Sequence, residues 1–200
     1  MEQCVVGIDE AGRGPLAGPV VAAAFVVLDA KYRVQGAKLR DSKLLSAKQR
    51  ELIYTELNGN SKVEWGIGQT SEKYIDKINI LQATRLAMRK AFLSLSRKLS
   101  KRGISPTVVI VDGTTLLEIP IPHHAVPHAD STVLSCMAAS IIAKVTRDRL
   151  MLKYHTHYPQ YGFDRHKGYG TAYHFKMLKK YGPSPVHRLS FRPLAKLSDA

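Results

Sequence analysis

The chain has 200 residues, of which 30 are Lys or Arg and 16 are Asp or Glu, giving a formal net charge of +14. This length accommodates one ordinary domain, and the excess positive charge favours nucleic acid over an anionic membrane as a polyanionic partner. The longest apolar run, Val20–Leu28, is about half of the ~20 residues that a membrane-spanning helix needs, and no secretory signal is visible. We expect a cytoplasmic, monomeric protein without membrane association.

The N-terminal segment contains two apolar runs separated by a Gly/Pro turn. Residues 5–9 predict a first strand ending at the pair Asp9-Glu10, and residues 18–28 predict a second strand. The short connection favours antiparallel pairing, and the nearly continuous apolar character of the second run predicts a central strand covered on both faces. Successive strand side chains point to opposite faces, so Asp9 and Glu10 can reach one point only if the strand ends between them.

The rest of the chain alternates between helical and strand-like patterns. Ser46-Ala47-Lys48-Gln49 is a capping-box pattern that predicts a helix ending near residue 58. The remaining elements are expected at 62–70 (strand), 71–77 and 81–99 (helices), 106–111 and about 125–126 (strands), and about 131–154 (helix). This order predicts an α/β fold with a central mixed β-sheet flanked by helices.

The last quarter of the chain differs in composition from the rest. Residues 151–200 hold nine Lys and Arg against two acids and are rich in aromatic residues. We therefore expect one domain over residues 1–200, with residues 155–200 as a small helical, basic and aromatic extension packed on it.

Four carboxylates lie at the boundaries of expected elements: Asp9, Glu10, Asp112 and Asp130. If the strands ending at Asp9 and Asp112 are neighbours, these acids meet at one edge of the sheet. Clustered carboxylates repel one another unless cations neutralise them, and hard oxygen ligands suit Mg²⁺ or Mn²⁺. However, Asp is also common in turns and as a helix N-cap, so the spacing alone does not assemble a site.

Several motifs, in order along nearly the whole chain, resemble the signature of type 2 ribonucleases H, in particular bacterial ribonuclease HII. They are Gly7-Ile8-Asp9-Glu10-Ala11-Gly12-Arg13-Gly14-Pro15, Asp41-Ser42-Lys43, Val111-Asp112-Gly113, residues 138–148, His166-Lys167-Gly168-Tyr169-Gly170-Thr171 and His187-Arg188-Leu189-Ser190-Phe191.

The resemblance implies an RNase H-like fold and a divalent-metal-dependent endoribonuclease. Such an enzyme hydrolyses RNA in RNA/DNA hybrids and incises duplex DNA on the 5′ side of an embedded ribonucleotide. The family's catalytic metal ligands fall on Asp9, Glu10, Asp112 and Asp130. The expected cofactor is Mg²⁺ or Mn²⁺, with two ions during catalysis.

The resemblance also implies residues that bind the substrate. The turn that senses the ribose 2′-hydroxyl falls on Gly12, Arg13 and Gly14, and the tyrosine that packs against the sugar at the DNA-side step falls on Tyr169. Ser140, Lys144 and Arg147 share one helix face, which is either solvated or, given the resemblance, in contact with phosphates. Lys43 is a further candidate phosphate contact.

One position departs from the family pattern, and two other functions stay open at this point. His128 stands where many members carry a basic residue such as lysine, so its role is not assigned. One alternative is a ribonuclease HIII-type nuclease, although the catalytic motif begins at residue 7 and we expect no preceding substrate-binding domain. The other is a non-catalytic module that binds RNA/DNA hybrids.

Overall fold

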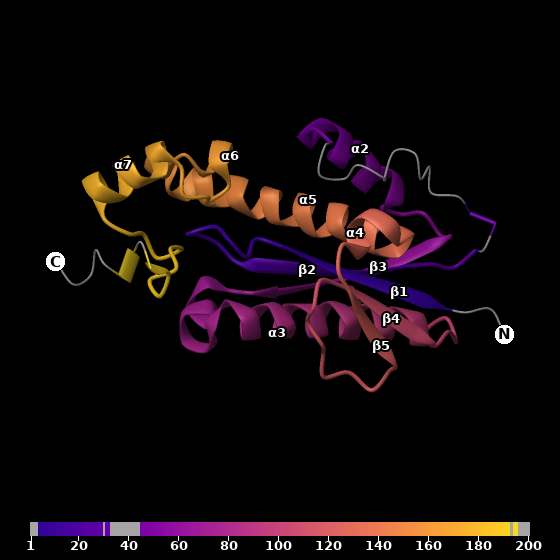
Figure 1. Cartoon of the computed structure of the whole chain (residues 1–200). Coiled ribbons are helices and arrows are strands. Elements are labelled where there is room, and N and C mark those ends of the chain that lie inside the picture. The colour runs from indigo at the N-terminus through magenta and orange to yellow at the C-terminus, as the bar shows by residue number, and fades with distance from the viewer. Residues whose placement is uncertain (1–3, 30, 33–44, 193, 196–200) are drawn as a thin grey trace.

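A five-stranded mixed sheet forms the centre of the molecule (Figure 1). The computed structural model describes residues 4–29, 31–32, 45–192 and 194–195. The strands are β1 (Val5–Ala11), β2 (Val20–Val27), β3 (Val63–Thr70), β4 (Val108–Asp112) and β5 (His123–Val126), in the spatial order β3-β2-β1-β4-β5. β2 pairs antiparallel with both β1 and β3, whereas β4 pairs parallel with both β1 and β5. The expected antiparallel pair and mixed sheet are therefore confirmed.

Helices cover both faces of this sheet (Figure 1). They are α2 (Ala47–Leu57), α3 (Glu72–Ser100), α4 (Ala129–Thr132), α5 (Leu134–His157), the 3₁₀ turn η1 (Pro159–Tyr161), α6 (Phe163–His166) and α7 (Ala172–Tyr181). One apolar core lies between the sheet and α3, and a second lies between the sheet, α5 and α2. β2 contributes to both cores and is buried along nearly its whole length, as its continuous apolar sequence predicts.

Close approach between α3 and β3 depends on two glycines. A Cβ atom at Gly66 would lie 2.4 Å from the backbone nitrogen of Leu95, and one at Gly68 would lie 2.0 Å from the carbonyl oxygen of Ala87. Any larger residue at either position would push the helix off the sheet.

Local sequence signals set several helix boundaries. The predicted capping box is present: the Ser46 hydroxyl accepts a hydrogen bond from Gln49 N–H, and the Gln49 side chain accepts one from Ser46 N–H. The two predicted helices at 71–77 and 81–99 form the merged helix α3, and they are separated at Asn79, where φ is 64° and ψ is 166°. Asn tolerates positive φ better than most residues, and its Oδ1 accepts Gln82 N–H.

Two expected boundaries are wrong. The first strand does not end at Asp9 but continues to Ala11, because β2 continues to pair with it there. The helix expected from about residue 131 is divided at Val133, whose extended backbone separates the single turn of α4 from α5. That division gives Asp130 its own short helix, preceded by His128 in the left-handed region (φ 60°).

The C-terminal helices build a third apolar cluster at one end of the sheet (Figure 1). Tyr161 and Phe163 are buried there against Leu16 and Ala17 of the β1–β2 connection, together with Met151 from α5. An isolated antiparallel bridge joins Ala17 to His187. The C-terminal segment therefore packs directly behind the connection that follows Asp9 and Glu10.

Candidate active site

Three aspartates from distant parts of the chain meet at one edge of the sheet. The parallel register pairs Ile8 with Val111, so the next residues, Asp9 within β1 and Asp112 at the end of β4, lie side by side. Asp130 approaches from α4, and its backbone N–H donates to Asp112 Oδ1 at 3.2 Å. One carboxylate oxygen from each of Asp9, Asp112 and Asp130 lies within 4.8 Å of the others.

The cluster is strongly anionic and poorly hydrated. Burial raises the pKa of Asp9 well above its usual value, and the charges of Glu10 and Asp112 raise it further. Hydrogen bonds from the Ser140 side chain and from Glu10 N–H, the latter 2.7 Å long, oppose this rise in part. Closely spaced carboxylates in a desolvated site fit a hard divalent cation, since a cation would relieve the repulsion among them.

The thiol of Cys136 lies close enough to the three aspartates for their charges to affect its pKa. It is fully buried in α5, and its Sγ lies 3.5 Å from the carbonyl oxygen of Ile110. Burial raises the pKa of this thiol to about 12, and the charges of the three clustered aspartates add to the rise.

Glu10 borders the cluster without belonging to the group of three. Its Oε1 lies 3.3 Å from Arg13 Nη1. Its Oε2 is buried and receives no hydrogen bond within the described part of the chain. Burial raises the pKa of Glu10, and the charge of Asp112 contributes, which places the two carboxylates within electrostatic reach. The buried Oε2 is thus a further oxygen that a cation at this edge could use.

The Gly12–Gly14 turn directly follows Glu10. Gly12 has φ +97°, and a Cβ there would lie 2.0 Å from Arg147 Nε, so only glycine fits. A Cβ on Gly14 would lie 3.7 Å from the Tyr169 ring, which is 47% exposed. The turn and the Tyr169 ring therefore line one surface.

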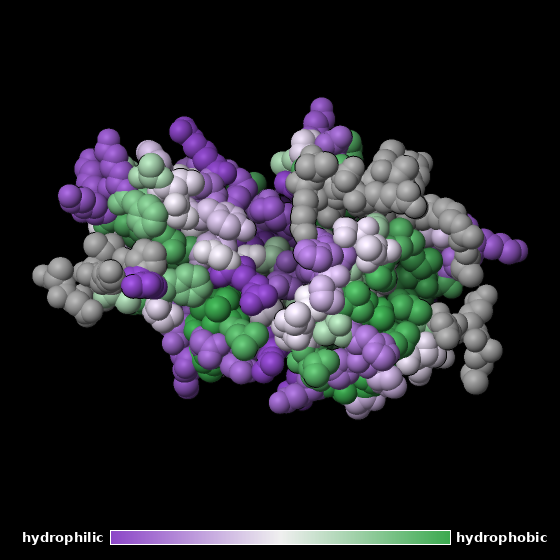
Figure 2. Space-filling model, in the orientation of Figure 1, coloured by the Kyte–Doolittle hydropathy of each residue, from purple (hydrophilic) through white to green (hydrophobic). Residues whose placement is uncertain are grey.

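A hollow lies where Glu10, the Gly12–Gly14 turn and Tyr169 meet. Its lining includes Glu10, the Gly12–Gly14 turn, Ser140 and Lys144 from α5, Tyr169, and Arg50 from α2. Figure 2 shows hydrophilic side chains over α6 and α7 and in the depression between them and α2. Arg50 cannot be identified from the sequence, because nothing in the helical pattern of residues 47–57 indicates that α2 borders the turn.

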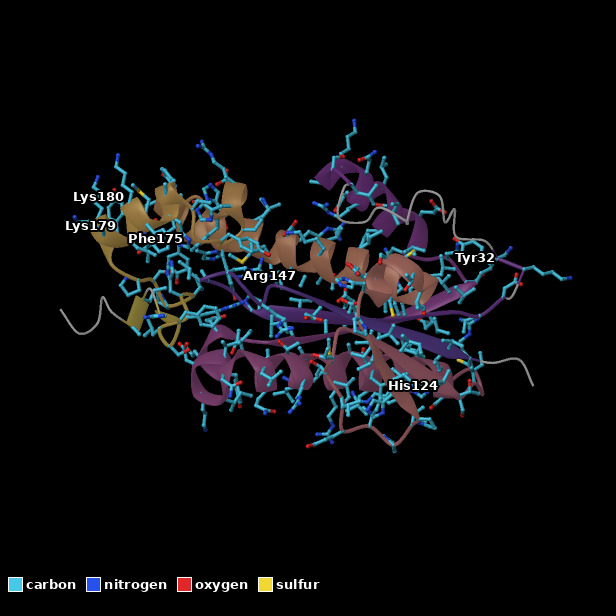
Figure 3. All side chains as sticks on the ribbon, viewed as in Figure 1. Tyr32, His124, Arg147, Phe175, Lys179 and Lys180 are labelled. Atoms are coloured by element: carbon cyan, nitrogen blue, oxygen red, sulfur yellow. The ribbon has the colours of Figure 1, made fainter. Side chains whose placement is uncertain are left out.

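The structure separates the three residues expected on one face of α5. Ser140 hydrogen-bonds to Asp9, and Lys144 forms a 2.8 Å ion pair with Asp148 at the edge of the hollow. Arg147 does not fit the expected phosphate contact, because it is only 1% exposed and points from α5 toward the sheet (Figure 3). Its Nε, Nη1 and Nη2 donate to the carbonyl oxygens of Pro19, Lys167 and Ala17. Lys43, also expected at phosphate, lies outside the described residues.

Two buried histidines lie behind Tyr169. His174 and His187 are joined through their Nε2 atoms at 2.9 Å, and His174 Nδ1 lies 2.9 Å from the carbonyl oxygen of Tyr169. Burial is the main cause that lowers the pKa of both imidazoles to about 4; the charge of His166 contributes at His174, and the charge of His174 contributes at His187. Both rings are therefore neutral at pH 7.

Comparison with solved structures defines the class of protein. The ribonuclease H2 of Pyrococcus horikoshii OT3 is 28% identical, with a TM-score of 0.77 over 98% of this chain and 97% of that one. Bst-RNase HIII in complex with Mn²⁺ shares the fold at 19% identity, with a TM-score of 0.76 over 98% of this chain and 70% of that one. The protein is thus a nuclease with the RNase H-like α/β fold and a cluster of acids at the carboxyl ends of its central strands.

Sequence comparison then gives the family. The Ribonuclease HII family profile matches residues 6–194. The Ribonuclease HII of Polynucleobacter asymbioticus is 48% identical over 193 residues, which cover 96% of this chain and 95% of that protein. The Ribonuclease HII of Syntrophobacter fumaroxidans is 50% identical over 189 residues, covering 94% and 76%. The chain belongs to the Ribonuclease HII family and is an endoribonuclease, which confirms the resemblance seen in its motifs.

The acidic cluster predicts how divalent metal changes thermal stability. Binding at about 100 times the Kd should stabilise the wild type by ~2.7 kcal/mol, which raises the Tm by several degrees. Asp9→Asn should abolish most of this shift and should raise the metal-free Tm, because it removes a buried charge from a repulsive cluster. Differential scanning calorimetry with and without Mg²⁺ or Mn²⁺ measures both effects. An unchanged metal-induced shift in the variant would contradict the assignment of Asp9 to the metal site.

The histidine pair predicts a loss of stability in acid. The folded-state pKa values of about 4 lie below the usual histidine pKa of 6.5, so between these limits the unfolded chain binds more protons. The contribution of these two histidines to the free energy of unfolding should therefore be complete above about pH 6.5 and should decline as the pH falls toward 4. His187→Gln removes one of the two groups, so its Tm should depend less steeply on pH than that of the wild type. His157→Gln, at an exposed histidine on α5, is the control and should keep the wild-type slope.

Proposed function

We propose that this protein hydrolyses the RNA strand of RNA/DNA hybrids and incises duplex DNA on the 5′ side of an embedded ribonucleotide. The observation that carries this proposal is the convergence of Asp9, Asp112 and Asp130 next to Glu10, which lines one hollow together with the Gly12–Gly14 turn and Tyr169. The first feature suits phosphodiester hydrolysis, and the second suits recognition of a ribose.

We propose Mg²⁺ or Mn²⁺ as the cofactor, with two ions during catalysis. Asp9, Asp112, Asp130 and Glu10 would hold the ions; the close approach of oxygens from the first three and the buried Oε2 of Glu10 support this assignment. Bound divalent ions supply activation of the attacking water and stabilisation of the leaving oxygen. The protein supplies the fixed carboxylates, and the Ser140 side chain orients Asp9 among them.

The ribose is proposed to bind between the turn and Tyr169. The Gly12–Gly14 backbone would sense the 2′-hydroxyl, which is the group that distinguishes RNA from DNA. Tyr169 would pack against the sugar at the DNA-side step. The closeness of Gly14 to the Tyr169 ring, and the exposure of that ring, support this pairing.

Positive charge would hold the nucleic-acid backbone. Arg13 and Lys144 border the hollow and are exposed or partly exposed, and both are proposed to lie near phosphates. Lys179 and Lys180 extend outward from α7 (Figure 3) and add to the positive charge of the surface. Lys43 stays a predicted phosphate contact.

Two alternatives to this function are weakened by different observations. The family match favours Ribonuclease HII over the HIII-type alternative. The convergence of three aspartates, of which Asp9 and Asp130 are buried, favours an enzyme over a non-catalytic hybrid-binding module, because such repulsion has no use in binding an anionic duplex.

We also propose that the protein acts as a cytoplasmic monomer, with residues 1–200 as one catalytic domain and residues 155–200 as an extension packed on it. The shared cluster of Leu16, Ala17, Tyr161 and Phe163 supports the single domain. None of the described helices combines the length and apolar character required to cross a bilayer.

A DNA duplex that contains one ribonucleotide tests the proposed function directly. With Mg²⁺ or Mn²⁺, the wild type should cut the ribonucleotide-containing strand at the phosphodiester 5′ of the ribose, and a chelator should stop the reaction. Asp9→Asn should lower the rate by at least about 10³-fold while binding the duplex with nearly wild-type affinity. Denaturing gel electrophoresis maps the cut, and fluorescence anisotropy measures binding. Cleavage of an all-DNA duplex at equal rate would contradict ribose recognition.

Removal of the Tyr169 ring tests the proposed sugar contact. Tyr169→Ala should slow incision at the single ribonucleotide by about 10- to 100-fold, because misplacement of the sugar costs rate more than affinity. Tyr74→Ala is the matched control, since Tyr74 is 56% exposed on α3 and away from the hollow. Single-turnover rates and dissociation constants separate the two effects. Equal rates for the two variants would remove Tyr169 from the site.

A further inference from the structure

Arg188 is a buried cation whose side chain donates only to backbone carbonyls in the hydrogen bonds that the structure shows. It is 0% exposed, and its guanidinium lies beneath the β1–β2 connection. Nε donates to Gly18 O at 2.8 Å, Nη1 to Arg13 O at 2.9 Å, and Nη2 to Gly12 O at 2.6 Å. Burying a guanidinium is costly without hydrogen bonds, so three charge-assisted bonds to one connection fix both partners.

The backbone around Arg188 is held in register with the same connection. Arg188 N–H donates to Leu16 O and Gly18 N–H donates to Val186 O, both at 2.8 Å, on either side of the Ala17–His187 bridge. After Arg188 the chain is held by Asp76 of α3, whose carboxylate accepts Leu189 N–H, Ser190 N–H and the Ser190 hydroxyl. The segment that carries the Arg188 guanidinium is therefore fixed on both sides, by the β1–β2 connection and by Asp76 of α3.

His187, the neighbour of Arg188, takes part in a chain of hydrogen bonds between Ser184 and Tyr169. The groups at the two ends of this chain determine which atom donates in each bond. The carbonyl oxygen of Tyr169 can only accept, so His174 Nδ1 carries the proton and donates to it. Neutral His174 then accepts at Nε2, which requires His187 Nε2 to donate. His187 Nδ1 must in turn accept, and Ser184 N–H donates to it at 2.9 Å. Both ends give the same tautomers, so the chain runs from Ser184 to the Tyr169 carbonyl.

These carbonyls matter because a peptide group is planar and trans. Fixing the carbonyls of Gly12 and Arg13 also fixes the N–H groups of Arg13 and Gly14, which point to the side opposite their carbonyls. Arg188 thus turns these two amides away from itself. Holding the Tyr169 carbonyl likewise limits rotation of the backbone that carries the exposed ring.

We propose that His187 and Arg188 are positioning residues that set the ribose-sensing turn and Tyr169 relative to each other. Arg188 holds the carbonyls of Gly12 and Arg13, and His187, acting through His174, holds the carbonyl of Tyr169. The inference rests on the proposed function, since it assigns an orienting role to residues that do not themselves meet the substrate.

Two substitutions of His174 separate positioning from simple stability. In His174→Asn the amide nitrogen takes the place of Nδ1 and can still donate to the Tyr169 carbonyl. In His174→Gln the amide reaches the place of Nε2, so the contact with His187 is kept and the donor to Tyr169 is lost. Asparagine is one methylene smaller than glutamine, so a loss of packing alone would harm His174→Asn more than His174→Gln. We expect kcat for incision at a single ribonucleotide to fall about tenfold or more in His174→Gln and less than about threefold in His174→Asn, with KM little changed in both.

Arg188 is tested by the graded pair Arg188→Lys and Arg188→Met. Lysine keeps one cationic donor group, so it should restore part of the kcat that methionine loses. Arg102→Met is the matched control, because Arg102 also donates to a backbone carbonyl, that of Ser61. Ser61 precedes the start of β3, whereas the β1–β2 connection lies near the other end of that strand. Each rate is measured well below the Tm of the variant concerned. If Arg188→Met does not fold, the His174 pair still decides the matter.

The outcomes distinguish this inference from the proposed function. If the wild type does not cut the single-ribonucleotide duplex, the proposed function fails and the positioning role fails with it. If the wild type cuts and Tyr169→Ala is slow, but His174→Gln and Arg188→Met keep wild-type kcat, only the positioning role is overturned. The positioning role would also be overturned if the losses of kcat in His174→Asn and His174→Gln followed only the loss of Tm in each variant.

Discussion

The parallel pairing of β1 with β4 is the constraint on which the site depends. Its register brings Asp9 and Asp112 to the same edge from positions more than one hundred residues apart in the sequence. β4 stops at Asp112, so the edge of β1 beyond Ile8 is free of that partner, and α4 can bring Asp130 against it. The stability of both apolar cores therefore supports a local arrangement of charges that is itself unfavourable.

The connection between β1 and β2 is held in an equally unusual way. Arg147 and Arg188 approach it from different elements, and their six guanidinium hydrogen bonds go to carbonyl oxygens of residues 12, 13, 17, 18, 19 and 167. A loop rich in glycine loses much conformational entropy on folding. Two buried cations that bind its backbone offset that loss and leave the outward surface of the turn clear. The acidic edge thus stays open to ions, while the adjacent backbone is rigid.

Much of this arrangement could be predicted from the sequence because it follows from local patterns. Apolar runs that end in acid located β1 and β4, the near-continuous apolar sequence placed β2 at the centre, and Ser46 with Gln49 marked the start of α2. The resemblance of the motifs correctly gave the family. These signals are short in sequence and repeat in many folds.

The parts that were missed depend on contacts across the fold. Strand pairing with β2 extends β1 past Asp9, which a single strand's pattern cannot show. Arg147 has the spacing of a surface residue, yet it is buried because its partners are main-chain carbonyls. Every residue has a carbonyl, so such a partner leaves no mark in the sequence. The same reason conceals Arg188 and the link from His187 through His174 to Tyr169.

The burial of the Cys136 thiol next to the three aspartates has a chemical consequence. Thiolates, not thiols, react with oxidants and alkylating agents, and a pKa of about 12 leaves almost no thiolate near neutral pH. Burial, with a smaller contribution from the charges of the same aspartates, therefore keeps this sulfur unreactive. As long as α5 stays packed on the sheet, the catalytic edge carries a cysteine without the vulnerability to oxidative damage that an exposed one would bring.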